Sequence, residues 1–373
     1  MARPALRPLA LFRQHQRQIS TSVPLLAATP SPVQVPVSLI ASLRKLRPVP
    51  LSLAREALQK SNNNIDSALS YLDSSSSAST TKKAEKVSGR STSEGVIAIS
   101  LLGGKRVGMV HVGCETDFVA RNDIFLKTSR SIAGTTAFLD VPGEREPSPA
   151  STDAPPSTAD PIRDFPVSAL MEAPIISLPS SDGAPAANTN PTPTTDPTTI
   201  SQSLLSTLSQ TGENLRLLRA VSFAAPFPSS PLIRYVPGAY AHGGSSSSEG
   251  KVGGIAVISA QSRDSEKPMA ARIHGVGGDQ LEKDLLDLAR TVARQVVGFP
   301  TMRISAGEGG EGEEEALLSQ QAMMFGKQEP VAQVLEEWGA GKGLKVDVVG
   351  FRRWAVGDDL TEVAAGDPQA QAV

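Results

Sequence analysis

Two β-prone runs separated by a glycine pair constrain the fold of this chain more than any other feature. Gly95–Leu102 and Lys105–Val112 flank Gly103-Gly104, and adjacent glycines adopt the positive φ angles that a tight hairpin turn requires. The spacing therefore predicts an antiparallel hairpin. A helix capped by Asn122 is expected next, with these apolar residues roughly on one face: Ile124, Phe125, Ile132 and Ala133.

The segment between the hairpin and this helix, Cys114–Asn122, combines charge with a large aromatic side chain. Asp117 and Phe118 stand next to each other on it. Connections on a rigid scaffold carry binding residues more often than cores do. The residues alone leave two interpretations open: either Phe118 packs inward and Asp117 is a solvated turn residue, or both side chains meet a partner.

Helix and strand patterns continue in the later part of the chain. Helical spacing predicts a core helix over Asp279–Val297, with Asp279 and Glu282 at capping-box spacing. Its entry, Gly275-Val276-Gly277-Gly278, lacks the third glycine of a dinucleotide-binding fingerprint and leads into acidic residues, which excludes a phosphate site there. A last strand is expected over Leu344–Trp354.

Several segments resemble one protein family, in the order that the family requires. Thr116–Asn122 is similar to the Thr-Asp-Phe-Val-Ala-Arg-Asn signature of elongation factor Ts, the nucleotide exchange factor for elongation factor Tu. Gly212-Glu213-Asn214-Leu215 resembles the family's Gly-Glu-Asn-Ile segment. Tyr240 and His242-Gly243 precede a β-prone run, Gly253–Ala260, as a similar Tyr-x-His-Gly segment does in the family.

The N-terminal region carries a further resemblance. Leu39–Leu72 resembles the family's three-helix module, which is itself similar to ubiquitin-associated domains, and Asn64 is the expected cap of the third helix. The family's Gly-Ala-Gly-Met turn after the first helix is replaced here by Arg47-Pro48-Val49-Pro50-Leu51. Proline at two positions of this turn restricts its backbone and fixes the angle between the helices.

The resemblance implies a protein that binds mitochondrial elongation factor Tu in its GDP-bound and nucleotide-free states. It would promote GDP release so that GTP can rebind, without covalent chemistry, a catalytic residue, a cofactor or a metal. Phe118 would be a wedge, Asp117 its polar partner, and His242 either a partner contact or an ordinary turn residue. The partner-binding residues carried over are Thr116, Asp117, Phe118, Val119, Arg121, Asn122 and His242.

The resemblance and the composition together suggest an α+β chain that has antiparallel sheets and unpacked insertions. A run rich in Pro, Ser, Thr and Ala, about 140–200, buries too little apolar area to order itself, except that Val167–Leu178 is apolar enough to dock as a short strand or helix. The expected order is a transit peptide (1–30), the UBA-like module (38–73), a linker (74–93), two α+β core subdomains (94–224 and 225–360) and a disordered tail (361–373).

The N-terminus has the composition of a mitochondrial transit peptide. No acidic residue precedes Glu56, and arginines such as Arg3 and Arg17 alternate with apolar residues, which is typical of matrix targeting; a disordered basic tail is the alternative. The apolar run is too short and interrupted to span a membrane. Removal of this segment would make the chain more acidic than its net charge of −2, which disfavours direct nucleic-acid binding.

Cys114 is the only cysteine in the chain, which excludes an intrachain disulfide and a cysteine-based metal cluster. His111 lies three positions before it, but that spacing on a strand points the two side chains to opposite faces. A small buried side chain is therefore favoured over a nucleophile. Two other functions stay open: a ubiquitin-binding adaptor, and a matrix enzyme with His242, Asp117 and Cys114 in one pocket.

Overall fold

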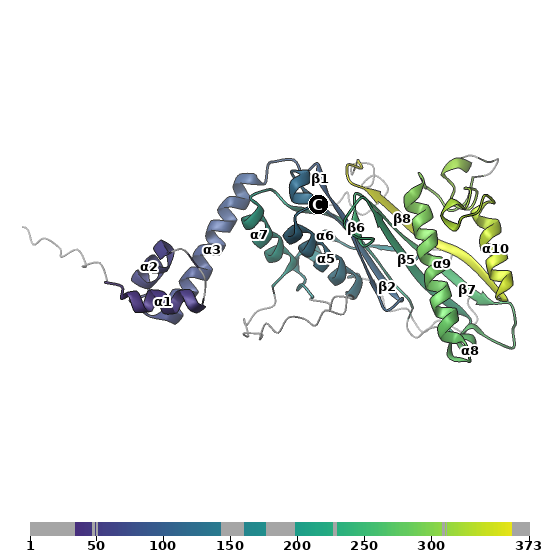
Figure 1. Cartoon of the computed structure of the whole chain (residues 1–373), viewed down its shortest axis with the longest axis horizontal. Helices are drawn as coiled ribbons and strands as arrows, with labels where there is room; N and C mark the ends of the chain where they lie inside the picture. Colours follow the sequence, from purple (N-terminus) through teal and green to yellow (C-terminus); the bar gives the residue numbers. More distant parts are fainter. Residues whose placement is uncertain are drawn as a thin grey trace, which may run out of the picture. The chain divides into compact units, whose positions relative to one another are not determined.

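A computed structural model describes residues 34–46, 49, 51–142, 160–176, 198–226, 230–307, 310 and 312–359. The chain divides into two compact units, Met1–Ser76 and Ser77–Val373 (Figure 1). The expected transit peptide and the C-terminal tail lie outside the described residues. So do most of the altered turn at 47–51 and, within the expected insertion, residues 143–159 and 177–197.

The first unit consists of three helices around a small apolar core. The helices are α1 (Val37–Leu46), α2 (Leu51–Lys60) and α3 (Ile65–Val87). Leu43 and Leu58 are fully buried in the core. As predicted, the Asn64 side chain caps α3, because its Oδ1 accepts a hydrogen bond of 2.9 Å from the amide of Ser67. Three packed helices agree with the expected module, whose likeness to ubiquitin-associated domains stays a prediction.

Helix α3 continues through most of the expected 74–93 linker and ends at Val87. No glycine or proline interrupts this stretch of the sequence, so nothing in it breaks the backbone hydrogen-bond ladder. Leu72 packs in the core of the first unit, whereas Val87 packs in that of the second. The connection is therefore helical at its start.

The predicted hairpin is confirmed and forms the centre of the first sheet. β1 (Glu94–Leu102) pairs with β2 (Arg106–Cys114) along its whole length, and Gly103 and Gly104 make the turn with φ of +55° and +62°. The sheet is antiparallel throughout, in the order β3-β4-β2-β1-β6. The outer strands are β3 (Arg163–Asp164), β4 (Arg216–Ala224) and β6 (Glu249–Gly250).

Helices cover one face of this sheet. They are α4 (Asp117–Ala120), α5 (Asp123–Phe138), α6 (Val167–Glu172) and α7 (Ile200–Thr211). Helix α5 packs on β1 and β2. Its expected apolar face is confirmed except at Ile124, which lies in the first turn of the helix and is 41% exposed. Helix α6 confirms that part of Val167–Leu178 docks, since Leu170 is fully buried.

The second sheet has the order β5-β7-β8 and is also antiparallel. Its strands are β5 (Ile233–His242), β7 (Val252–Ser262) and β8 (Leu344–Ala355). The helices of this half are α8 (Met269–His274), α9 (Gly278–Gly298) and α10 (Val331–Gly341), with short 3₁₀ turns η2 (Glu313–Glu315) and η3 (Met323–Phe325). The predicted core helix and last strand are therefore confirmed.

The predicted capping box of α9 is wrong. The N-cap is Gly277, with φ of +80° and no side-chain capping bond, so Asp279 lies inside the first turn of the helix and does not cap it. Glu282 instead forms an ion pair with Arg234. The glycine supplies a left-handed backbone that ends the preceding turn, and this geometry sets where the helix starts.

The second unit is a stack of four layers: helices, sheet, sheet and helices (Figure 1). Met109 and Phe223 of the first sheet pack against Ile255 and Trp354 of the second sheet in a shared core. Strand β6 follows the second sheet in the chain but pairs with β1 of the first. The α+β class with antiparallel sheets is confirmed, whereas the proposed division at residue 224 stays a prediction.

Candidate functional site

The corner, defined as residues 115–122, directly follows β2 and exposes Phe118. The Phe118 side chain is 83% exposed, whereas the next two residues, Val119 and Ala120, are buried. Thr116 is the N-cap of the single-turn helix α4, and its hydroxyl accepts from the amide of Val119 at 3.4 Å. The structure therefore contradicts the interpretation that Phe118 packs inward.

Polar residues on either side of Phe118 make local contacts within the corner. Asp117 and Arg121 form an ion pair at 3.3 Å, with both side chains largely exposed. Asn122 caps α5 as predicted, because its Oδ1 accepts from the amide of Ile124 at 2.8 Å. The caps at Thr116 and Asn122 fix the backbone of the corner. Because an exposed ion pair contributes little stability, Asp117 can exchange Arg121 for a group on a partner.

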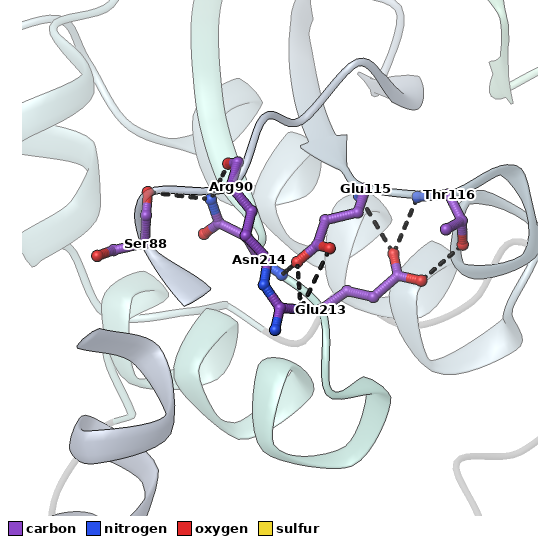
Figure 2. Close-up of polar contacts among 6 residues, drawn as sticks. All are labelled: Ser88, Arg90, Glu115, Thr116, Glu213 and Asn214. Atoms are coloured by element: carbon purple, nitrogen blue, oxygen red, sulfur yellow. Dashed lines mark hydrogen bonds and ion pairs between the residues drawn. The ribbon is translucent and has the colours of Figure 1, made fainter. Parts of the chain in front are cut away.

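The carboxylate of Glu213 fixes the start of the corner (Figure 2). One oxygen accepts from the backbone amides of Glu115 at 3.2 Å and Thr116 at 3.0 Å. The other accepts from the Thr116 hydroxyl at 2.6 Å. Glu213 follows Glu115 by 98 positions and Thr116 by 97 positions in the chain. A distant segment therefore satisfies backbone amides that the strand and the helix leave unpaired.

Glu115 returns this contact in the opposite direction (Figure 2). Its carboxylate accepts from the backbone amide of Asn214 at 2.7 Å and lies 3.4 Å from the guanidinium of Arg90. The buried amide of Asn214 donates to the carbonyls of Arg90 at 2.8 Å and Ser88 at 3.4 Å. Sequence reasoning identified Glu213 and Asn214 only through a family resemblance and missed these contacts.

Cys114 is unsuited to be a nucleophile. It is fully buried, and its thiol donates to the carbonyl of Thr116 at 3.2 Å. Burial, and secondarily the charge of Glu213, raise the pKa of the thiol to about 12, so it stays protonated at neutral pH. His111 belongs to the opposite face of β2, as predicted, beside Arg219.

His242 lies at the end of β5 in the second sheet. It is exposed and pairs with Val252 of β7. Gly243, with φ of +79°, begins the turn that follows. The structure therefore places His242 on a strand end, and it does not bring this residue together with Cys114, which has no exposed surface.

The described residues show neither a metal-binding cluster nor a membrane-spanning helix. In the part of the chain that the structure describes, no group of three or more His, Cys, Asp or Glu side chains is arranged to hold a metal ion. None of the helices described there combines the length and the apolar character needed to cross a membrane.

Comparison with known proteins found close relatives, although no family model matches the chain. Over 365 residues it is 58% identical to proteins named "Elongation factor Ts, mitochondrial" from two strains of Cryptococcus neoformans var. neoformans serotype D, covering 96% of this chain and 98% of each relative. A protein of the same name from Coprinopsis cinerea is 32% identical over 352 residues, covering 88% of this chain and 94% of the relative.

Proposed function

The chain belongs to the elongation factor Ts family and is a mitochondrial member of it, and on this premise we propose that it is a guanine nucleotide exchange factor for mitochondrial elongation factor Tu. It binds the GDP-bound partner, accelerates GDP release and leaves when GTP rebinds. The observation that carries the proposal is Phe118, 83% exposed on a turn whose backbone is held by Glu213.

An exposed phenylalanine on a fixed turn is suited to act as a wedge. Burial of the ring in a partner would contribute roughly 2 kcal/mol, and the fixed backbone means that little conformational entropy is lost on binding. GDP is held in its binding protein by a phosphate loop and Mg²⁺ acting together. Movement of the helices that support this site would therefore weaken several nucleotide contacts at once.

The coupling between factor and nucleotide must be reciprocal. If the factor weakens GDP binding, GDP weakens factor binding by the same free energy. The factor therefore binds the nucleotide-free partner most tightly and is displaced when a nucleotide returns. This cycle makes and breaks no covalent bond, so it requires no acid, base or metal from the factor.

The other proposed contacts have separate roles. Asp117 is the polar partner contact beside the wedge. Thr116, Val119, Arg121 and Asn122 hold the corner in shape through the caps, the buried valine and the ion pair described above. His242 is a second contact on the far sheet, and the three-helix unit adds further contact area.

The experiment that tests this function measures the release of a fluorescent GDP from mitochondrial elongation factor Tu. The full chain, at a small fraction of the partner concentration, should accelerate release many-fold. The double variant Asp117→Ala, Phe118→Ala should fold normally and lose most of this acceleration. No acceleration by the unaltered chain would contradict the proposed function.

A further inference from the structure

Resting on this exchange function, we propose that Glu213 and Glu115 are positioning residues: they set the direction of Phe118 and thereby determine how strongly factor binding is coupled to GDP release. The two glutamates and their partners, Ser88, Arg90, Thr116 and Asn214, are called the carboxylate clamp (Figure 2).

The first half of the clamp satisfies three donors with one side chain. Glu213 accepts from two successive backbone amides and from the Thr116 hydroxyl, at 3.2, 3.0 and 2.6 Å. A carboxylate has about four acceptor positions, and bonds to an ionised acceptor are roughly twice as strong as neutral ones. Loss of this side chain would leave the donors of a half-buried turn without their acceptor.

The second half of the clamp runs in the opposite direction. Glu115 accepts from the amide of Asn214 at 2.7 Å, and Asn214 donates its side-chain amide to the carbonyl of Arg90 at 2.8 Å. The end of β2, the segment before β1 and the segment before β4 are therefore joined at one point. Because each carboxylate binds the segment that carries the other, neither segment can shift without breaking both sets of bonds.

The clamp acts on Phe118 through the backbone, at the start of the corner. The ring packs on almost nothing, being 83% exposed, so its direction follows the backbone. Helix α4 has only four residues, too few to be stable by itself. The Thr116 hydroxyl joins the clamp to helix α4, since it donates to Glu213 and accepts from the amide of Val119.

A factor with a broken clamp should still bind elongation factor Tu, but its binding should be only weakly coupled to GDP release. A misdirected wedge no longer distinguishes the GDP-bound partner from the nucleotide-free partner, so the two affinities become similar. General destabilisation of the factor would instead lower both apparent affinities by the same factor. The ratio of the two affinities thus separates positioning from a merely structural role.

The experiment measures the affinity of the full chain for GDP-bound and for nucleotide-free elongation factor Tu. Glu213→Ala should lower the ratio of these affinities at least about fivefold, with most of the loss on the nucleotide-free side. Glu213→Gln should recover much of it, since an amide oxygen still accepts from both backbone amides. The matched control is Glu336→Ala, which removes a carboxylate of α10 that is paired with Arg263. This variant should leave the ratio unchanged.

Each alternative outcome has a distinct meaning. A wild-type ratio near one would overturn the exchange function itself. A ratio that collapses in Phe118→Ala but stays intact in Glu213→Ala would overturn the clamp proposal and leave the function standing. An equal loss of both affinities in Glu213→Ala would also overturn the clamp proposal. If Glu213→Ala does not fold, Thr116→Val removes only the hydroxyl and should lower the ratio in the same direction, and an unchanged ratio would contradict the proposal.

Discussion

The corner at residues 115–122 and helix α9 are both held firmly, but by opposite means. In α9, apolar side chains such as Leu285, Val292 and Val296 are fully buried and anchor the backbone. In the corner, polar groups from a distant segment anchor the backbone, and the aromatic side chain at its centre stays in solvent. The difference teaches that a fixed backbone can present an apolar side chain to a partner without burying it.

The largest expected stability effect contrasts two phenylalanines in adjacent helices. Phe125 is fully buried in the core of the second unit, whereas Phe118 is 83% exposed. Phe125→Ala should lower the free energy of unfolding by about 3–5 kcal/mol, and Phe118→Ala by less than about 0.5 kcal/mol. Urea unfolding of both variants measures this. Comparable losses would break the comparison, because Phe118 would then belong to the core.

A buried histidine on β2, His111, should make stability depend on pH. Burial, and then the charge of Arg219, lower the pKa of His111 to about 4 from an ordinary value of 6.5. Between these values the unfolded chain binds a proton that the folded chain does not, so stability falls as pH falls from about 6.5 to about 4, by roughly 3 kcal/mol in total.

Urea unfolding at a series of pH values tests this dependence. His111→Gln should flatten the decrease between pH 7 and pH 5, while His242→Gln, at an exposed strand end, should leave it unchanged. An identical pH dependence in the chain with and without His111 would show that other groups are responsible.

The packing of α9 on β5 depends on a glycine. A Cβ added at Gly238 would lie 2.0 Å from the carbonyl oxygen of Ala289, so helix and strand would have to separate. Gly238→Ala should therefore cost about 1–3 kcal/mol, seen as a lower thermal midpoint. Gly341→Ala, where no atom lies within 4 Å of the added carbon, is the matched control. Equal midpoints for the two variants would contradict the close packing.

The smallest expected effect concerns the cap at the far end of the corner. Asn122→Ala removes the acceptor for the amide of Ile124 and should cost about 1 kcal/mol, with a modest reduction in exchange. Asn122→Ser keeps a capping oxygen and should restore most of the stability in the same thermal assay. If serine and alanine destabilise equally, the cap is not the cause.

The sequence-based predictions succeeded where the signal was local. The glycine pair located the hairpin, and helical spacing located α9. Helix α7 was missed although Thr199 and Gln202 form a capping box at its start, because the proline-rich run before it obscured that boundary.

The carboxylate clamp could not be predicted in the same way. No periodicity relates Glu115 to Glu213, since hydrogen bonds join segments almost a hundred residues apart in the chain. The exposure of Phe118 was equally open, because an aromatic residue on a connection can face either the core or the solvent. Only the folded chain, with its polar anchors in place, distinguishes these two directions.

The most direct test of the central claim compares two exposed phenylalanines as drivers of GDP release. Phe118 and Phe138 are 83% and 53% exposed, but only Phe118 lies on the corner. Stopped-flow release of fluorescent GDP from mitochondrial elongation factor Tu should slow at least about tenfold with Phe118→Ala and stay near the wild-type rate with Phe138→Ala. Wild-type release by a folded Phe118→Ala chain would contradict the account.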